Sequence, residues 1–413
     1  MSTLLVENIA KLIQVEKDTP RKWVAGVDMQ KMDCVENAYL LVEDGKIKQW
    51  GKKKNAPQAG IDTRIDAKGG MLFPSFCDSH THLVYAGSRE IEYIDKIRGL
   101  SYEEIAKRGG GINNSAARLH AASEEELYES AMERINEIIR CGTGAVEIKS
   151  GYGLSTEDEL KMLRVIRRIR ETSPITVRAN FLGAHAVPLA YKGRQGEYVD
   201  LIINEMIPLV ASEGLADFVD VFCDAGFFTV EETERILMQG IKYGMRPKIH
   251  ANELACSGGI QAGVKYNALS VDHLEFTGDD EIAALLGSET MPTLLPGAAF
   301  FLGMENPPAR KMIEAGLPIA MASDFNPGSS PSGDMKFVVS LGCIKLRLLP
   351  EEAFNATTIN SAYAMGISDT HGSIATGKVA NFYITKPIPS YEFMPYAYTT
   401  KLVDRVFLAG KEY

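Results

Sequence analysis

The stretch FPSFCDSHTHLVYAG, residues 73–87, is apolar at its start, contains a proline and then carries His80 and His82 one residue apart. Alternate residues of a β-strand point to the same side, so both imidazoles can reach one point at the end of this segment. Imidazole nitrogens at that separation suit a transition metal. Two hydrogen-bonded histidines in a core or at the surface would give the same pattern, so the pair alone is weak evidence.

Runs of this kind recur along the chain. Eight β-like runs end in polar residues or glycine, and in chain order they are MLFPSFCDSHTH, TGAVEIKSGYG, ITVRANFLGAH, FVDVFCDAG, RPKIHANE, LSVDHLE, TMPTLLPG and LPIAMASDFNPG. The segments between them have helical periodicity, as in TEDELKMLRVIRRIRETS, where one apolar stripe is formed by Leu160, Leu163, Ile166 and Ile169. Strands that alternate with helices imply parallel strands joined by right-handed crossovers, and eight units favour closure into a (β/α)8 barrel. An open parallel sheet is the alternative.

The two ends of the chain have a different pattern. The first part contains AYLLVEDGKIKQWG, and the last part contains GKVANFYITK and KLVDRVFLAGKEY, which are short strands around glycine-containing turns. Neither part has helical crossovers, so we expect them to meet in one small β domain outside the barrel. The predicted fold is therefore α/β: a TIM-like (β/α)8 barrel at 71–375 and a small β-sandwich domain built from 1–70 and 376–413.

Composition limits the class of protein. Of the 413 residues, 45% are hydrophobic and 24% are charged, which is typical of globular proteins. The net charge of -10 argues against nucleic-acid or membrane partners, because both need concentrated Lys and Arg. The six cysteines form no CxxC pair, and no apolar run approaches the ~20 residues that span a bilayer. We expect a cytoplasmic protein.

Further strand ends carry residues at the same relative place as the first two histidines. The third, fifth, sixth and eighth runs end in His185, His250, His273 and Asp324. Of the seven histidines, only His120 and His371 lie elsewhere. The C-terminal ends of barrel strands form the active face, so these side chains are expected to meet there.

A metal held by three imidazoles and one carboxylate keeps a position for water, as catalytic sites do. The expected ligands are His80, His82, His250 and Asp324. A metal in such a site lowers the pKa of bound water towards ~7 and provides a hydroxide nucleophile at neutral pH. The pattern therefore predicts hydrolysis.

Two further residues are candidates for proton chemistry. Glu253 follows His250 by three residues, where its carboxylate can take a proton from the water and pass it to a leaving nitrogen. An acid at a helix N-terminus would have the same position in the sequence. His273 can polarise a carbonyl or hydrogen-bond the nucleophile, and a core histidine bonded to backbone is the alternative.

These features resemble the amidohydrolase superfamily, which comprises metal-dependent hydrolases on a (β/α)8 barrel with a small β-sandwich from both chain ends. LVEDGKIKQWG, FPSFCDSHTH and TGKVANFYI stand where that superfamily has its sandwich turn, first-strand metal motif and return to the sandwich. One branch of the superfamily acts in histidine degradation, and it is similar in HTHLVYAGSREIEY, YEEIAKRGGGI, EIKSGYGL, FLGAHAVP, DVFCDAGFF, LLPGAAFFL and SDFNPGSSP. The resemblance covers nearly the full chain.

The resemblance implies hydrolysis of 4-imidazolone-5-propanoate at its ring carbonyl to N-formimidoyl-L-glutamate. It implies one zinc or iron ion on the four ligands above, Glu253 as general base and His273 as partner of the carbonyl or hydroxide. The substrate contacts it implies are Arg89, Tyr102, Tyr152, His185, Glu253, Asn326, Gly328 and Ser329. The expected partner is thus a small molecule with a carboxylate, and the family likeness suggests a homodimer.

Arg89 is the candidate for the substrate carboxylate, because a guanidinium binds carboxylates in bidentate fashion. The alternative is a structural ion pair with Glu90 or Glu92. The chain departs from the family at Ser75, where Gly is usual, and at Asn381, where Asp is usual. These departures affect only the expected local turn geometry.

Other functions remain open at this stage. The fourth run, FVDVFCDAG, has no lysine that could be carbamylated to bridge two metals, so a two-metal site is disfavoured. A deaminase of a heterocyclic base is the nearest alternative enzyme, and it would not need Arg89. A catalytically silent barrel that serves as an interaction protein is the alternative from another class.

Overall fold

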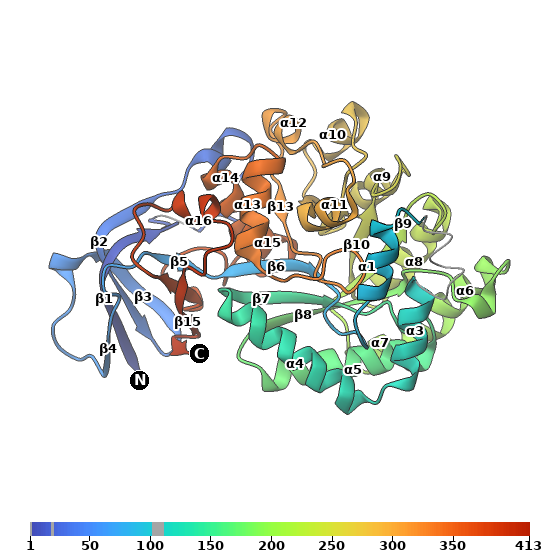
Figure 1. Cartoon of the computed structure of the whole chain (residues 1–413), viewed down its shortest axis with the longest axis horizontal. Helices are drawn as coiled ribbons and strands as arrows, with labels where there is room; N and C mark the ends of the chain where they lie inside the picture. Colours follow the sequence, from blue (N-terminus) through green and yellow to red (C-terminus); the bar gives the residue numbers. More distant parts are fainter. Residues whose placement is uncertain (1, 18–19, 101–110) are drawn as a thin grey trace.

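The computed structural model describes residues 2–17, 20–100 and 111–413, and it consists of a barrel beside a second sheet (Figure 1). The barrel strands are β6 (Phe76–Thr81), β7 (Thr143–Lys149), β8 (Thr176–Ala184), β9 (Phe218–Cys223), β10 (Arg246–Ala251), β11 (Ser270–His273), β12 (Met291–Leu294) and β13 (Ala320–Met321). They are hydrogen-bonded in chain order, and every neighbouring pair is parallel. Each of the eight predicted runs contains one of these strands.

The segment that follows β13 meets β6 and closes the ring of strands. Thr81 forms a parallel bridge with Phe325. On either side of it, Asp324 N–H donates to the carbonyl of His80 at 3.0 Å, and His82 N–H donates to the carbonyl of Phe325 at 2.9 Å. The (β/α)8 barrel is therefore confirmed over the open sheet, and its seam lies at the predicted metal ligands.

Helices surround the barrel (Figure 1). The α-helices are α1 (Glu90–Ile97), α3 (Ile112–Ala121), α4 (Glu124–Arg140), α5 (Thr156–Thr172), α6 (Gln195–Leu201), α7 (Ile207–Ser212), α8 (Val230–Lys242), α9 (Gly259–Lys265), α10 (Asp279–Leu285), α11 (Pro296–Leu302), α12 (Ala309–Glu314), α13 (Met335–Lys345), α14 (Pro350–Thr357), α15 (Ile359–Ala364) and α16 (Phe393–Tyr396). Short 3-10 turns lie at η1 (Gly26–Gln30), η2 (Lys53–Asn55) and η3 (Leu189–Tyr191), and a π-helical turn lies at η4 (Ile202–Met206).

The predicted stripe on α5 packs as expected. Its side chains at 160, 163, 166 and 169 are all buried, with Ile166 and Ile169 fully so. Ser155 begins the helix by accepting a hydrogen bond from the backbone N–H of Asp158, which satisfies one of the free donors at the helix start. The large apolar core of the protein thus lies between the barrel strands and the surrounding helices.

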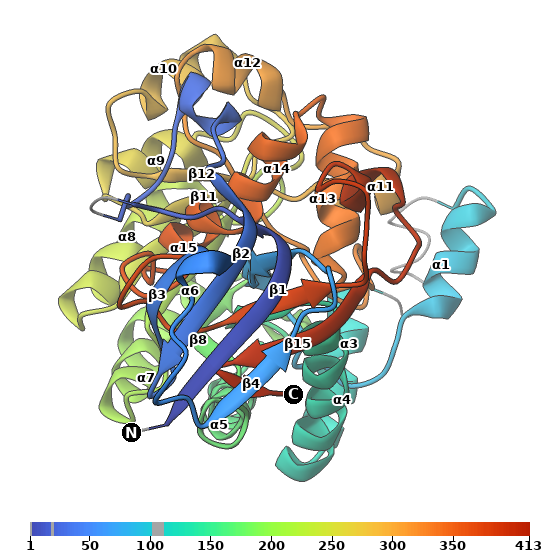
Figure 2. The ribbon, with the colours of Figure 1, turned by 90° about the vertical axis from the view of Figure 1, so that its left-hand side faces the viewer.

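Both chain ends build the second sheet. Its strands are β1 (Thr3–Ile13), β2 (Cys34–Glu43), β3 (Lys46–Lys52), β4 (Thr63–Asp66), β5 (Leu72–Pro74), β14 (Phe382–Thr385), β15 (Val403–Leu408) and β16 (Lys411–Glu412). Their order is β16-β15-β14-β5-β1-β2-β3, with β4 beside β1, so the N- and C-terminal strands lie side by side (Figure 2). The expected separate sheet from both termini is confirmed, although β5 joins it from within the stretch 71–375 that was assigned to the barrel. The sheet has its own apolar core.

The run that begins at Met71 is divided between the two sheets. β5 lies in the terminal sheet between β1 and β14, whereas β6 starts the barrel after Ser75. Ser75 N–H donates to the carbonyl of Asn381 at 3.0 Å, and the Asn381 side chain donates to the carbonyl of Gly144 at 3.0 Å. The two positions that depart from the family therefore meet at the junction of the domains.

No helix among the described residues is long and apolar enough to cross a membrane.

Candidate metal centre and active site

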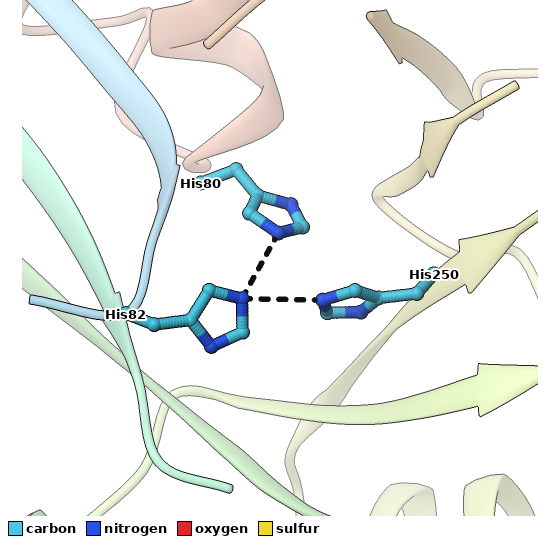
Figure 3. A group of neighbouring side chains, drawn as sticks. All are labelled: His80, His82 and His250. Carbon is cyan, nitrogen blue, oxygen red and sulfur yellow. Dashed lines mark hydrogen bonds between the residues drawn. The ribbon is translucent and has the colours of Figure 1, made fainter. Parts of the chain in front are cut away.

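Three imidazoles converge at the C-terminal end of the barrel (Figure 3). His82 Nε2 lies 3.3 Å from His80 Nε2 and 3.4 Å from His250 Nε2. Asp324 Oδ1 lies 3.5 Å from His80 Nε2 and 3.6 Å from His82 Nε2. The three predicted histidine ligands form one group, and Asp324 lies beside two of them. His80 lies on β6 and His250 on β10, whereas His82 directly follows β6 and Asp324 follows β13.

The partners of the other ring nitrogens define which atoms face the centre. His80 Nδ1 lies 2.6 Å from Asp272 Oδ2, and His250 Nδ1 lies 3.0 Å from Asp220 Oδ1. A carboxylate accepts a hydrogen bond from each Nδ1–H, so the Nε2 of both rings carries a lone pair. If His82 Nε2 carried a proton, it could donate a hydrogen bond to the Nε2 of His80 or of His250 but not to both. A cation between the rings can accept the lone pairs of all three Nε2 atoms.

The spacing also fits a metal. A tetrahedral ion with bonds of about 2.0–2.1 Å to nitrogen places two ligand atoms about 3.3–3.4 Å apart, close to the separations between these nitrogens. Burial lowers the pKa of His80 and His82 well below the ordinary value, and nearby positive charges add to this effect. The two rings are therefore neutral and available as ligands at neutral pH. The residues fit the metal that their spacing predicts.

Asp324 reaches the centre from a strained loop. Its φ of 53° lies in the left-handed region, which an aspartate adopts only where its surroundings hold it. The backbone bond to His80 and a side-chain bond from Ser329 Oγ to Asp324 Oδ2 at 3.3 Å hold it there. Burial raises the pKa of this carboxyl to about 7. A cation beside it would favour the ionised form.

Glu253 and His273 lie on one side of the centre. Glu253 Oε2 is 3.7 Å from His273 Nε2. α9 begins only at Gly259, so Glu253 is not a helix N-terminal acid, and that alternative is wrong. Instead, Asp224 Oδ2 accepts the backbone N–H groups of Glu253 and Leu254 at 2.7 and 2.9 Å and holds the segment in place.

His273 is held in an unusual state. Burial lowers its pKa, yet the carboxylates of Glu253, Glu275 and Asp324 raise it to about 10, so the ring is a cation. Its Nδ1 lies 3.8 Å from Glu275 Oε2, too far for a hydrogen bond, so that attraction acts through space. A φ of 88° shows that the surrounding structure imposes the backbone conformation of His273.

A cavity of about 830 Å³ opens above these groups. Of the predicted residues, its lining includes His82, Arg89, Tyr152, His185, His250, Glu253, His273, Asp324, Asn326, Gly328 and Ser329. His80 belongs to the metal group beneath the cavity. Tyr102 lies outside the described residues. Phenylalanines at 222, 227, 300 and 301 give the cavity apolar walls.

Arg89 forms the ion pair that was considered as its alternative role. Its Nε and Nη2 donate to Glu92 Oε2, at 2.8 and 2.5 Å. Arg89 nevertheless lines the cavity, and its Nη1 reaches Gly328 so closely that a Cβ there would lie 2.3 Å away. A second cation, Lys96, donates to the carbonyl of Gly328 at 3.1 Å. Two basic side chains therefore flank one part of the wall.

The loop after β13 is organised by Asn326. Its Oδ1 accepts the N–H groups of Gly328 and Ser329, both at 2.8 Å. Its Nδ2 donates to the carbonyl of Asp324 and to Ser329 Oγ, both at 2.7 Å. One amide thus fixes the predicted contacts of this loop relative to the metal ligand.

Tyr152 and His185 lie beside each other in the cavity lining, with ring centroids 5.4 Å apart. Glu159 accepts the N–H groups of Gly151, Gly153 and Leu154 and so fixes the turn that carries Tyr152. His185 Nδ1 donates to the carbonyl of Gly151 at 3.0 Å, which leaves its Nε2 as an acceptor. Its ring stacks on His82, with centroids 5.1 Å apart.

Comparisons with known proteins agree with this geometry. The model of the Amidohydrolase family matches residues 71–412. The imidazolonepropionase of Flavobacterium johnsoniae is 54% identical over 407 residues, which cover 98% of this chain and 99% of the relative. That of Christiangramia forsetii is 53% identical over 409 residues and covers 99% of both chains. The chain belongs to the imidazolonepropionase family of amidohydrolases.

A solved structure outside the imidazolonepropionase family shares the fold. Atrazine chlorohydrolase from Arthrobacter aurescens, complexed with zinc, superposes with a TM-score of 0.71 at 15% identity, over 99% of this chain and 94% of that chain. The predicted recognition of the family is confirmed, and the group formed by His80, His82 and His250 could hold a metal ion.

Sequence reasoning missed several residues of this imidazolonepropionase-family site. Lys96 had no signal in the sequence. Four other residues did have a signal in the sequence, which was their place in the alternation of β7, β9 and β11. Every second residue of a strand points to the same side, and these four face the barrel interior: Glu147, Lys149, Asp220 and Asp272. Asp220 and Asp272 orient the imidazoles and are as integral to the centre as the ligands.

Proposed function

We propose that the protein hydrolyses the ring amide of 4-imidazolone-5-propanoate to N-formimidoyl-L-glutamate, a step of histidine degradation. The observation that carries the proposal is the arrangement of one cavity, with three imidazole Nε2 atoms and Asp324 at its base and Arg89 and Lys96 in its wall. Such a cavity suits a small anion with a reactive carbonyl. The relatives named imidazolonepropionase support the choice of substrate.

We propose one zinc or iron ion held by His80, His82, His250 and Asp324. Three nitrogen ligands and one oxygen ligand suit either metal. When bound, the ion lowers the pKa of a water molecule towards ~7 and makes it a nucleophile at neutral pH.

Glu253 acts as the general base. Its carboxylate takes a proton from the attacking water and passes it to the ring nitrogen as the bond between that nitrogen and the carbonyl carbon breaks. The carbonyl carbon gains the oxygen of water and becomes the new carboxylate of the product. Asp224 holds the backbone of Glu253 from below, so the base keeps its position during both proton transfers.

His273 stabilises the charge that develops on the carbonyl oxygen. The cationic ring is pre-oriented by its constrained backbone, so little reorganisation is needed when the oxygen becomes negative. Its distance of 3.7 Å from Glu253 leaves the two groups close without a direct hydrogen bond. Glu253 can therefore hydrogen-bond to the attacking water, and His273 can hydrogen-bond to the carbonyl oxygen.

Arg89 and Lys96 receive the propanoate. Glu92 neutralises part of the charge of Arg89, and the ammonium of Lys96 provides a second positive group beside Gly328. Tyr152, His185, Asn326, Gly328 and Ser329 contact the ring, and we keep Tyr102 as a further proposed contact. The phenylalanine side chains of the lining give the ring an apolar surface to pack on.

We also propose that the functional partner is this small carboxylate, with no nucleic acid or membrane partner, and that the protein is a cytoplasmic homodimer. The net charge of -10 supports the absence of nucleic-acid and membrane partners, and the cysteine pattern supports a reducing compartment. The proposed dimer rests on the family likeness. Light scattering of the purified protein at several concentrations tests the dimer, and a monomeric mass throughout would contradict it.

The direct test is to mix metal-analysed protein with freshly made imidazolone propanoate and to follow loss of its ultraviolet absorbance. Glu253→Gln should retain its metal and lose about 10²–10⁴-fold in kcat, the range for removal of a general base. Arg89→Ala should raise KM. Absence of turnover by the metal-loaded wild-type protein would refute the proposal, and unchanged affinity of Arg89→Ala would favour a neutral heterocyclic substrate.

A further inference from the structure

A buried charge network lies in the barrel beneath the metal ligands. Its members are Glu147, Lys149, Asp220, Lys248 and Asp272, and none of them is more than 1% exposed. They come from β7, β9, β10 and β11, at positions that face the barrel interior. Charges this deep are stable only when they are paired, so each contact in the network affects the position of the others.

Lys149 stands between the groups that orient the imidazoles. Its Nζ donates to Asp220 Oδ2 at 2.8 Å and to Glu147 Oε1 at 2.6 Å, and it lies 3.7 Å from Asp272 Oδ2. Asp220 and Asp272 are the same carboxylates that accept Nδ1–H from His250 and His80. One ammonium therefore contacts the partners of two metal ligands.

The carboxylates of the network outnumber its ammonium groups, because Glu147, Asp220 and Asp272 face Lys149 and Lys248. Burial lowers the pKa of Lys149, but Asp220, Glu147 and Asp272 raise it above the ordinary value, so it is a cation.

We propose that Lys149 is a positioning residue for the metal, holding Asp220 and Asp272 where they orient His250 and His80 towards the ion. This inference rests on the metal site of the proposed function. Without the ammonium, Asp220 loses its lysine partner, and the three carboxylates are left with Lys248, which pairs with Glu147 and lies 3.9 Å from Asp272. The repulsion between these carboxylates would weaken the hydrogen bonds to Nδ1 of His80 and His250. The Nε2 atoms of the two rings would then no longer point towards one ion.

Lys248 offers a matched control. It is equally buried and also pairs with Glu147, but its other hydrogen bonds go to the backbone carbonyls of Ser79 and Ala364, at 3.0 and 3.3 Å. It lies 3.9 Å from Asp272 and donates no hydrogen bond to that carboxylate. Lys248→Met therefore removes the same buried charge while leaving the Lys149 contacts in place.

The test measures metal binding in the full-length protein. Wild type, Lys149→Met and Lys248→Met are stripped with a chelator, and zinc affinity is measured by competition with a chromophoric chelator. The visible spectrum of the cobalt-loaded form reports ligand geometry. Lys149→Met should bind zinc at least about tenfold more weakly and show an altered cobalt spectrum, whereas Lys248→Met should stay within about threefold of wild type.

Equal zinc affinity of Lys149→Met and wild type, or equal loss in both lysine variants, would overturn the inference. If Lys149→Met does not fold, Glu147→Gln is added to it, which restores the net charge of the network and leaves both orienting carboxylates intact. The double variant should show the same weakened affinity, and its failure to fold would reassign Lys149 to a purely structural role. A wild-type protein that binds no zinc would refute the proposed metal site itself.

Discussion

Gly328→Ala should weaken substrate binding through Arg89. A Cβ at this position would lie 2.3 Å from Arg89 Nη1 and 2.9 Å from its Cζ. The guanidinium would therefore have to move by about 1 Å, a displacement that is large for a group meant to hold a ligand. Glu92 holds the same guanidinium through two hydrogen bonds, so the movement also strains that ion pair.

The expected rise in KM follows from these contacts. A hydrogen bond to a charged group contributes about 1.5–3 kcal/mol, and partial loss of one bond corresponds to about 1.4 kcal/mol, or about a tenfold rise in KM. Metal content should not change, because Gly328 donates to Asn326 and not to a ligand. The measurement is KM and kcat by ultraviolet absorbance, with metal analysis of each preparation.

A double-mutant cycle separates this cause from a direct contact between Gly328 and the substrate. If the methyl group acts through the guanidinium, Gly328→Ala should add little in an Arg89→Ala background. Gly196→Ala is the control, because no heavy atom lies within 4 Å of its added Cβ. A full tenfold effect that persists without Arg89, or a loss confined to kcat, would refute the reasoning.

Three further outcomes are expected. Asp224→Asn should lower kcat about tenfold with little change in KM, because the carboxylate that holds the backbone of Glu253 is weakened. Chelation should abolish turnover and lower the melting temperature, and added zinc should restore both. Burial and Lys378 lower the pKa of His371 to about 4. The neutral ring therefore contributes its whole stabilisation above pH 6.5, and the free energy of unfolding falls by up to about 3 kcal/mol towards pH 4. His371→Gln should reduce this fall when unfolding is measured by chemical denaturation.

Each of these outcomes can fail independently. An Asp224→Asn protein with wild-type kcat would show that the Glu253 segment needs no such support. Full activity after verified metal removal would contradict hydrolysis by a metal-activated water. A His371→Gln protein that keeps the wild-type loss of stability in acid would assign that loss to other groups.

The eight strands and the metal ligands could be predicted because they depend on local rules. Period-2 alternation and polar strand ends are visible in a short window, and the C-terminal ends of barrel strands meet wherever the chain places them. Asp324 could be predicted to lie near His80, although it is far from it in sequence, because both are at C-terminal ends of barrel strands. The bridge between Thr81 and Phe325 is the contact that brings Asp324 beside His80 and His82.

The wall of the cavity could not be predicted in the same way. Lys96 lies on a helix whose position depends on contacts with the loop after β13, 232 residues away in sequence. Helical periodicity says which face of α1 is apolar and nothing about which loop it meets. The same holds for Arg89, where sequence allowed both a ligand contact and an ion pair, and the structure contains the pair with Glu92 at the edge of the cavity.

The seam of the barrel has a consequence for synthesis of the chain. His80 lies on the first barrel strand, His82 directly follows it, and Asp324 follows the last strand. A nascent chain that has not reached residue 324 therefore offers at most three of the four proposed ligands. With that ligand set, full coordination of an ion would wait for the segment after the last strand, so ion capture would mark completion of the ring and join its two ends.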